Sequence, residues 1–119
     1  MKNKIALSIS TISLALMGIV LPVKADTVDA RCDIYPLGED KASASIPCTF
    51  SQRQGFVSIE REDGVRYELE PVGNEPGNYV DQDGKAAYRQ AGLGDAGQIY
   101  RLANESVYVY WDPAPFNQK

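Results

Sequence analysis

The sequence predicts a small all-β domain: an antiparallel barrel or sandwich of about eight short strands with one disulfide. Short strand-like runs alternate with clusters of Gly, Pro, Asp and Asn, a spacing typical of hairpin-rich folds. The pairs Asp63-Gly64 and Asp83-Gly84 mark hairpin turns, and no helix is predicted. Barrels and sandwiches protect the edges of many short strands, so we favour these two architectures.

The first two strands are expected around the cysteines, over Arg31–Tyr35 and Ile46–Ser51. Cys32 and Cys48 are the only cysteines, and joining them would close a loop of 17 residues. The chain-entropy relation gives such a crosslink about 3 kcal/mol of stabilisation. The alternative is two free buried thiols. A redox role lacks the Cys-x-x-Cys spacing, and zinc lacks ligands because the chain has no histidine.

The first predicted hairpin joins Phe56–Arg61 to Val65–Glu70 through Asp63-Gly64. The second of these strands alternates strictly between apolar and polar residues, as a half-buried strand does. We expect Val65, Tyr67 and Leu69 to share its buried face.

The second predicted hairpin joins Asn78–Val80 to Ala86–Arg89 around Asp83-Gly84. A single helical turn within Ala87–Leu93 is the alternative for its last part. The residues Asp81–Gly84 only faintly resemble a calcium loop. Its ligand positions would hold Tyr79 and Gln90, so no metal is expected.

The last predicted hairpin joins Gln98–Leu102 to Val107–Trp111. Along its final strand, Tyr108 and Tyr110 lie on the face opposite to the valines and the tryptophan. These two tyrosines either pack their rings or stand at the surface, where tyrosine is enriched in binding sites. Three other tyrosines are expected in the core: Tyr67, Tyr88 and Tyr100.

Between these hairpins lies a glycine-rich segment that contains Gly92, Gly94 and Gly97. Its glycine spacing imitates a dinucleotide fingerprint, but the strand–helix context that the fingerprint needs is missing. We therefore expect a wide loop that presents backbone amides to a partner. No cofactor is predicted.

Residues 1–25 have the order of a secretory signal peptide, which leaves 26–119 as a single small β domain. Lys2 and Lys4 precede an apolar run from Ile5 to Leu21, and a small-residue cleavage site ends at Ala25. The alternative is a retained membrane anchor, although the run is short for one. Cleavage would leave no stable membrane span. We expect a periplasmic or secreted protein in which the cysteines are oxidised.

The full chain has a net charge of −4, and removing the predicted leader leaves 9 basic and 16 acidic residues. The negative electrostatic field of this excess of acidic residues repels nucleic acid and anionic lipid surfaces. It favours a basic protein or an envelope component as partner, and it also simply keeps a small domain soluble.

Catalysis finds little support in this sequence, so we do not expect an enzyme. Without histidine, serine or cysteine nucleophiles lack their usual base. A carboxylate-dependent hydrolase is the alternative, and the acids available for it include Glu60, Glu68, Glu70 and Asp112.

Two resemblances add to this interpretation. The stretch from Cys48 to Asp112 resembles a small exported bacterial family of unassigned function. The segments that carry this resemblance are Ser51–Gly55, Asp63–Tyr67, Ala87–Gln90 and Val107–Asp112.

The architecture of an exported, cysteine-stapled antiparallel β domain is also similar to the bacterial C-type lysozyme inhibitors. That family inserts a loop with a Ser-Gly-x-x-Tyr pattern into the lysozyme cleft. The nearest segment here is Asp63–Tyr67, with aspartate in place of the serine.

The function expected from the sequence is therefore binding, or an envelope-associated interaction, by an exported non-enzymatic β domain. The expected contacts are the face of Tyr108 and Tyr110 and the loop with Gly92, Gly94 and Gly97. A lysozyme inhibitor and a small hydrolase are the alternatives.

Overall fold

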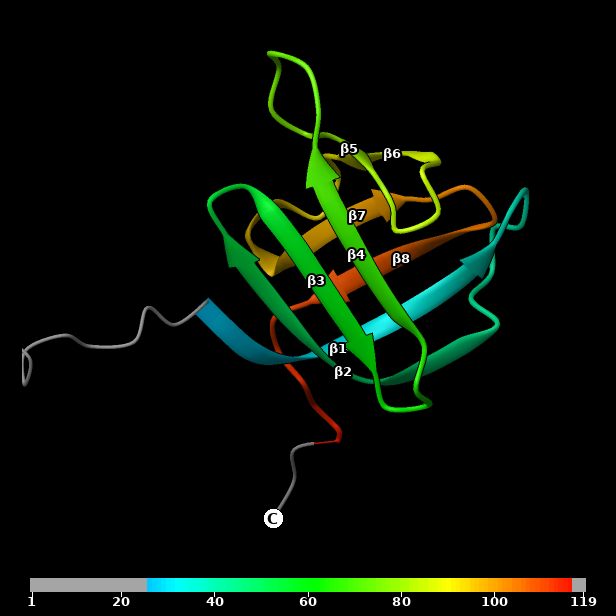
Figure 1. Cartoon of the computed structure of the whole chain (residues 1–119). Helices are drawn as coiled ribbons and strands as arrows, with labels where there is room; N and C mark the ends of the chain where they lie inside the picture. The colour runs from blue at the N-terminus through cyan, green and yellow to red at the C-terminus, as the bar shows by residue number, and fades with distance from the viewer. Residues whose placement is uncertain (1–25, 117–119) are drawn as a thin grey trace, which may run out of the picture.

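The computed structural model describes residues 26–116, which form a closed barrel of eight antiparallel strands (Figure 1). The predicted leader lies outside the described residues. Each strand pairs with its neighbours in the chain, and the last strand pairs with the first. The elements are β1 (Asp26–Pro36), β2 (Ala44–Arg53), β3 (Phe56–Arg61), β4 (Arg66–Pro71), β5 (Asn78–Val80), β6 (Ala86–Gln90), η1 (Gly94–Ala96), β7 (Gly97–Arg101) and β8 (Glu105–Tyr110). The prediction of an antiparallel β fold is confirmed, and the barrel is the form it takes.

Alternation of side chains along the strands builds the core. In β8, Val107 and Val109 are fully buried while Tyr108 lies on the opposite face, as the sequence pattern indicated. The same period of two runs through most of the other strands; in β7, the neighbouring residues Ile99 and Tyr100 are both buried. The buried cluster consists of Ala30, Cys32, Ile34, Cys48, Phe50, Val57, Ile59, Tyr67, Leu69, Tyr79, Ala87, Tyr100, Val107 and Val109.

The expectation that Tyr88 belongs to the core is wrong, because its side chain is 49% exposed. In the pairing of β5 with β6, Ala87 lies opposite Tyr79, and both are buried. Tyr88, one position further along the strand, must therefore face outwards. Tyr79 supplies the buried ring that the sequence interpretation assigned to Tyr88.

The strand ends also differ from the predicted ones. β1 and β2 extend over 11 and 10 residues and form the longest paired ladder of the barrel. The helical turn suggested within Ala87–Leu93 is wrong, because residues 86–90 belong to β6. The turn of 3-10 helix follows instead as η1. Within residues 26–116, no helix has the length and apolar character needed to cross a membrane.

The two Asp-Gly hairpins share one turn geometry. Gly64 and Gly84 adopt positive φ values of 96° and 79°, and their amides donate to the carbonyls of Arg61 and Asp81. The hairpin between β2 and β3 was not predicted. It is a two-residue turn in which Gln54 and Gly55 both have positive φ, 53° and 87°. This pair of dihedrals is that of a type I′ turn.

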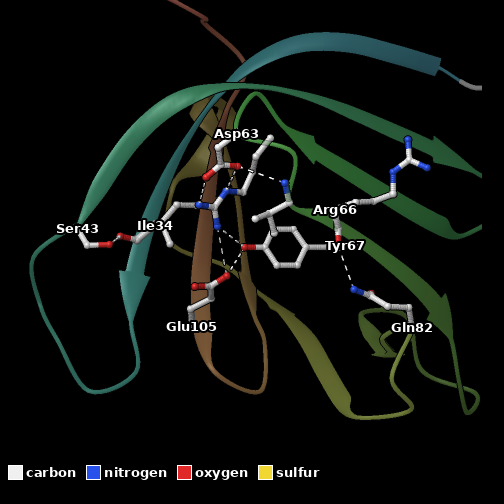
Figure 2. Close-up of polar contacts among 9 residues, drawn as sticks. Ile34, Ser43, Asp63, Arg66, Tyr67, Gln82 and Glu105 are labelled. Carbon is white, nitrogen blue, oxygen red and sulfur yellow. Dashed lines mark hydrogen bonds and ion pairs between the residues drawn. The ribbon is translucent and has the colours of Figure 1, made fainter.

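A side chain completes the barrel where the strands are shortest. β5 pairs with β4 at only Glu70 and Pro71. Further along β4, the Gln82 side-chain amide donates to the carbonyl of Arg66 at 3.0 Å (Figure 2). Its oxygen accepts from the amide of Glu68, also at 3.0 Å. Gln82 thus satisfies the backbone groups of β4 that a longer β5 would have paired.

The disulfide joins Cys32 of β1 to Cys48 of β2, with their Cα atoms 5.9 Å apart. In the register of these strands Cys48 lies opposite Ala30, so the crosslink runs diagonally between neighbouring inward-facing positions. Both cysteines belong to the buried cluster. The bond therefore fastens β1 to β2 from inside the barrel.

Replacing both Cys32 and Cys48 with alanine should lower the free energy of unfolding by about 3 kcal/mol, because the unfolded chain then regains the freedom of the opened loop. Urea denaturation of the double variant, beside the oxidised wild type, measures this loss. A single Cys48→Ala variant is the control. It also lacks the crosslink, so its difference from the double variant measures the packing of the remaining sulfur. An unchanged denaturation midpoint in the double variant would contradict the assigned role of the crosslink.

Candidate functional site

The two ends of the barrel have different chemistry. One end carries the β1–β2, β3–β4, β5–β6 and β7–β8 connections, and we call it the closed end. The other end carries the β2–β3, β4–β5 and β6–β7 connections and the segment after β8, and we call it the Trp111 end. In Figure 1 the β4–β5 connection projects beyond the sheet at this second end.

A charged network lies at the closed end. Arg61 binds both oxygens of Asp63, at 3.0 Å from Nε and 2.5 Å from Nη2. Its Nη1 donates to the hydroxyl of Tyr67 at 2.8 Å and lies 3.4 Å from Glu105. The hydroxyl of Tyr67 in turn donates to Glu105. Figure 2 shows the Tyr67 ring directed towards Glu105 beneath Asp63. The network joins β3, β4 and β8 across the interior.

These contacts explain the protonation states of the network. Burial raises the pKa of Tyr67 well above its ordinary value, and the hydrogen bond to Glu105 adds to the rise. Burial opposes the charge of Arg61, but its hydrogen bonds to Asp63 and Tyr67 outweigh this, and the pKa of Arg61 rises. The same bond from Arg61 lowers the pKa of Asp63. The network therefore holds a neutral phenol between a guanidinium and carboxylates.

The Trp111 end is open and contains two hollows that share the indole of Trp111. The first has a volume of about 540 Å³. It is lined by Val28, Phe50, Gln52, Gln54, Gly55 and Trp111. By the alternation of β1 and β2, Val28 and Gln52 continue the inward-facing rows of Ala30 and Phe50 to the rim of the barrel.

The second hollow, of about 400 Å³, lies beneath the glycine-rich connection. It is lined by Arg89, Gln90, Ala91, Gly92, Leu93, Gly94, Asp95, Gly97, Gln98 and Trp111. The loop turns back over β7, since a Cβ on Gly92 would come 3.2 Å from Cδ1 of Ile99. The predicted loop residues Gly92, Gly94 and Gly97 all border this hollow.

Trp111 is supported by a series of aromatic rings. Its ring meets that of Phe50 edge-on at 5.0 Å, and the Phe50 and Tyr100 centroids are 6.0 Å apart. Tyr79 follows at 6.1 Å from Tyr100, and its hydroxyl accepts from Arg89 at 3.2 Å. The indole is therefore held by the core on one side and is partly exposed between the hollows.

Gly97 fixes the approach of the loop to β8. A Cβ at this position would lie 1.9 Å from the carbonyl oxygen of Val109. The amide of Trp111 donates to the carbonyl of Ala96 at 3.0 Å, directly beside this contact. The absence of a side chain at Gly97 thus lets the loop and Trp111 meet.

The predicted tyrosine face lies on the outside of β8, β1 and β7. Tyr108 packs its ring on Tyr35 at 4.3 Å, and the Arg101 guanidinium lies 5.6 Å from the Tyr108 ring centroid. Arg31 covers the ring of Tyr110 at 4.2 Å. Both predicted tyrosines are half-buried under these neighbours. Their rings are already engaged within the domain.

The structure brings the two predicted contact regions together, because Gly97 lies opposite Tyr110 in the pairing of β7 with β8. They point in different directions, however: the glycines border a hollow at the barrel end, and the tyrosines lie on its outer wall. Sequence reasoning missed Trp111 as a site residue. The available signals were that it is the only tryptophan and that it ends an alternating strand.

Of the acids weighed for hydrolysis, Glu60, Glu68 and Glu70 lie on the outer wall, and Asp112 lies in the segment after β8. Glu60 pairs with Arg66 at 2.8 Å, and Glu68 accepts a hydrogen bond from Ser58 at 2.9 Å. The segment Asp63–Tyr67, compared with the inhibitory loop, spans the β3–β4 turn and the start of β4. Its tyrosine is 7% exposed and belongs to the closed-end network.

No protein-family model matches the chain, and comparisons with curated proteins and with solved structures found no match.

Alkaline titration should detect the burial of Tyr67 and Tyr100. Burial raises the pKa of Tyr67 and Tyr100 far above the ordinary value of 10.0. The folded barrel therefore keeps two phenols protonated that the unfolded chain would ionise. Their contribution to stability is complete below pH 10 and declines as the pH rises towards the folded-state pKa values.

Near-ultraviolet absorbance of phenolate, followed together with circular dichroism, measures this effect. Tyr67 and Tyr100 should ionise only as the fold is lost. In Tyr67→Phe, one fewer late phenol is expected. Ionisation of all seven in one step before unfolding would contradict the burial described here.

Replacing Gly97 with alanine should destabilise the domain by about 3 kcal/mol, because the added methyl meets a backbone oxygen that cannot move without disturbing β8. Thermal denaturation provides the measurement. Ala91→Ser, an exposed change in the same connection, is the control and should stay within about 0.5 kcal/mol of wild type. Equal stability of the two variants would show that β7 and β8 do not meet this closely.

Proposed function

We propose that this protein is an exported, non-enzymatic binding domain and that it binds its ligand at the Trp111 end of the barrel. The observation that carries the proposal is the pair of hollows that meet at a partly exposed indole. Mouths of β-barrels are common ligand sites, since side chains from several strands converge there on a rigid frame. The opposite end is occupied by its own charged network.

The crosslink between Cys32 and Cys48 supports export, because disulfides persist in oxidising compartments such as the periplasm or the cell exterior. The signal-like residues 1–25 support the same location. An envelope component would then be within reach of the site.

Binding is favoured over hydrolysis by the placement of the carboxylates. Glu60 and Glu68 lie on the outer wall and are engaged by Arg66 and Ser58, away from the two hollows. Glycoside hydrolysis needs two carboxyl groups that face each other across a bound sugar. Among the described residues that line either hollow at the Trp111 end, Asp95 is the only carboxylate.

Lysozyme inhibition is a separate proposal that rests on architecture. The eight-stranded barrel with one disulfide agrees with it, but Tyr67 is directed inwards. An inhibitory contact would therefore use another surface. Lysozyme turnover measured at a near-stoichiometric ratio of the two proteins decides this point.

The single tryptophan permits a direct test of the binding site. Protein grown with fluorotryptophan carries one fluorine NMR signal, which can be observed in the presence of unlabelled extract. Adding a solubilised envelope fraction should shift or broaden this signal in a saturable way, because the ligand contacts the indole.

The matched control is Trp111→Phe combined with Tyr88→Trp, which moves the reporter to the exposed outer face of β6. Its signal should not respond. A silent Trp111 signal, or an equal response from both reporters, would refute binding at this end.

A further inference from the structure

We propose that the Trp111 end binds a neutral oligosaccharide, with the indole under one sugar ring and the amides of Gln52 and Gln54 on its hydroxyls. This inference rests on the proposed function and specifies the ligand of that same site.

The described lining of the first hollow is uncharged. None of the residues within 26–116 that line it is ionisable, although charged residues make up 24% of the chain. An anionic or cationic ligand would lose its hydration there without gaining an ion pair, which costs free energy. A ligand that is polar but neutral avoids this cost.

The two glutamines have hydrogen-bonding capacity to spare. Among the described residues, the side-chain amides of Gln52 and Gln54 take part in no hydrogen bond. Each amide has a carbonyl acceptor and an NH₂ donor side by side. Adjacent sugar hydroxyls also each donate and accept, so one amide can bind two of them. The C–H face of the same sugar ring is apolar and suits the exposed part of Trp111.

The backbone at Gln54 holds a side chain in a conformation that most residues avoid. It is the only non-glycine residue within 26–116 with positive φ, 53°, in a turn that favours asparagine or glycine. A residue with a Cβ is strained in this region. Strained residues of this kind cluster at ligand sites, where the side chain is worth the cost. Here that side chain lines the uncharged hollow.

The second hollow gives the ligand room beyond the indole. Gln98 uses its carbonyl oxygen to accept from Tyr100 at 2.5 Å, which leaves its NH₂ group to donate. Arg89 and Asp95 add one charge of each sign at this side. Because Trp111 borders both hollows, the geometry suits a chain of sugars that passes across the indole.

An extended peptide is the other ligand class for such a site, but the barrel gives a peptide fewer backbone hydrogen-bonding partners. Peptides commonly add a strand to a free sheet edge. Here the strands of the described chain pair all the way round, and Gln82 fills the gap beside β4. A peptide would have to rely on side-chain contacts alone.

The test titrates fluorotryptophan-labelled protein with neutral hexasaccharides of glucose and of N-acetylglucosamine, and with an anionic hexagalacturonate. At least one neutral sugar should shift the Trp111 signal in a saturable way, with an affinity about tenfold or more above that of the anionic one. Gln52→Ala and Gln54→Ala should each weaken this binding about tenfold. Asn104→Ala, an exposed amide in the β7–β8 turn, should leave it unchanged.

Gln54→Gly separates recognition from fold. Glycine accepts positive φ, so the melting temperature should stay the same or rise, while sugar affinity should fall about tenfold. If Gln54 only shapes the turn, the affinity will not change, and the assigned role is wrong.

The outcomes distinguish this inference from the function on which it rests. If no neutral sugar shifts the signal but the envelope fraction does, the site exists and the ligand class is wrong. The ligand class is also wrong if protease treatment of the fraction abolishes the shift, because the ligand is then a peptide. If neither sugars nor envelope fractions act on Trp111, both proposals fail.

Discussion

The pairing of β8 with β1 is the constraint on which the rest of the structure depends. It runs from Arg31 opposite Tyr110 to Pro36 opposite Glu105 and turns an eight-stranded sheet into a closed wall. Once the wall is closed, every second side chain enters an interior that is reached only from its two ends. Function that needs a concave site must then use an end or a depression of the outer surface.

The two ends of the barrel carry side chains of different chemistry. At the closed end, hydrogen bonds and ion pairs join Arg61 to Asp63, Tyr67 and Glu105 in one network. The guanidinium of Arg61 is largely enclosed, and these partners offset the cost of burying its charge. At the other end aromatic and amide groups leave space. This asymmetry, more than any single residue, directs the functional proposal to Trp111.

Most of the fold could be predicted from the sequence, but little of the candidate site could be. Period-two patterns were enough to place Val107 and Val109 inside and Tyr108 outside, and the turn residues gave most of the strand order. The pattern could not tell Tyr79 from Tyr88, because the register of two short strands decides which ring is enclosed. Likewise, the sequence pattern does not show that Trp111 lies at the open end of the barrel and Tyr67 at the closed end. That difference arises from contacts between residues far apart in the chain.

The pairing of β8 with β1 also affects when the barrel can close during synthesis of the chain. β1 is synthesised first, yet one of its two neighbours is complete only when Tyr110 has left the ribosome. Until then the N-terminal portion exposes unsatisfied backbone along β1, and non-local partnerships of this kind form slowly. Such a topology delays closure of the barrel until β8 has been synthesised.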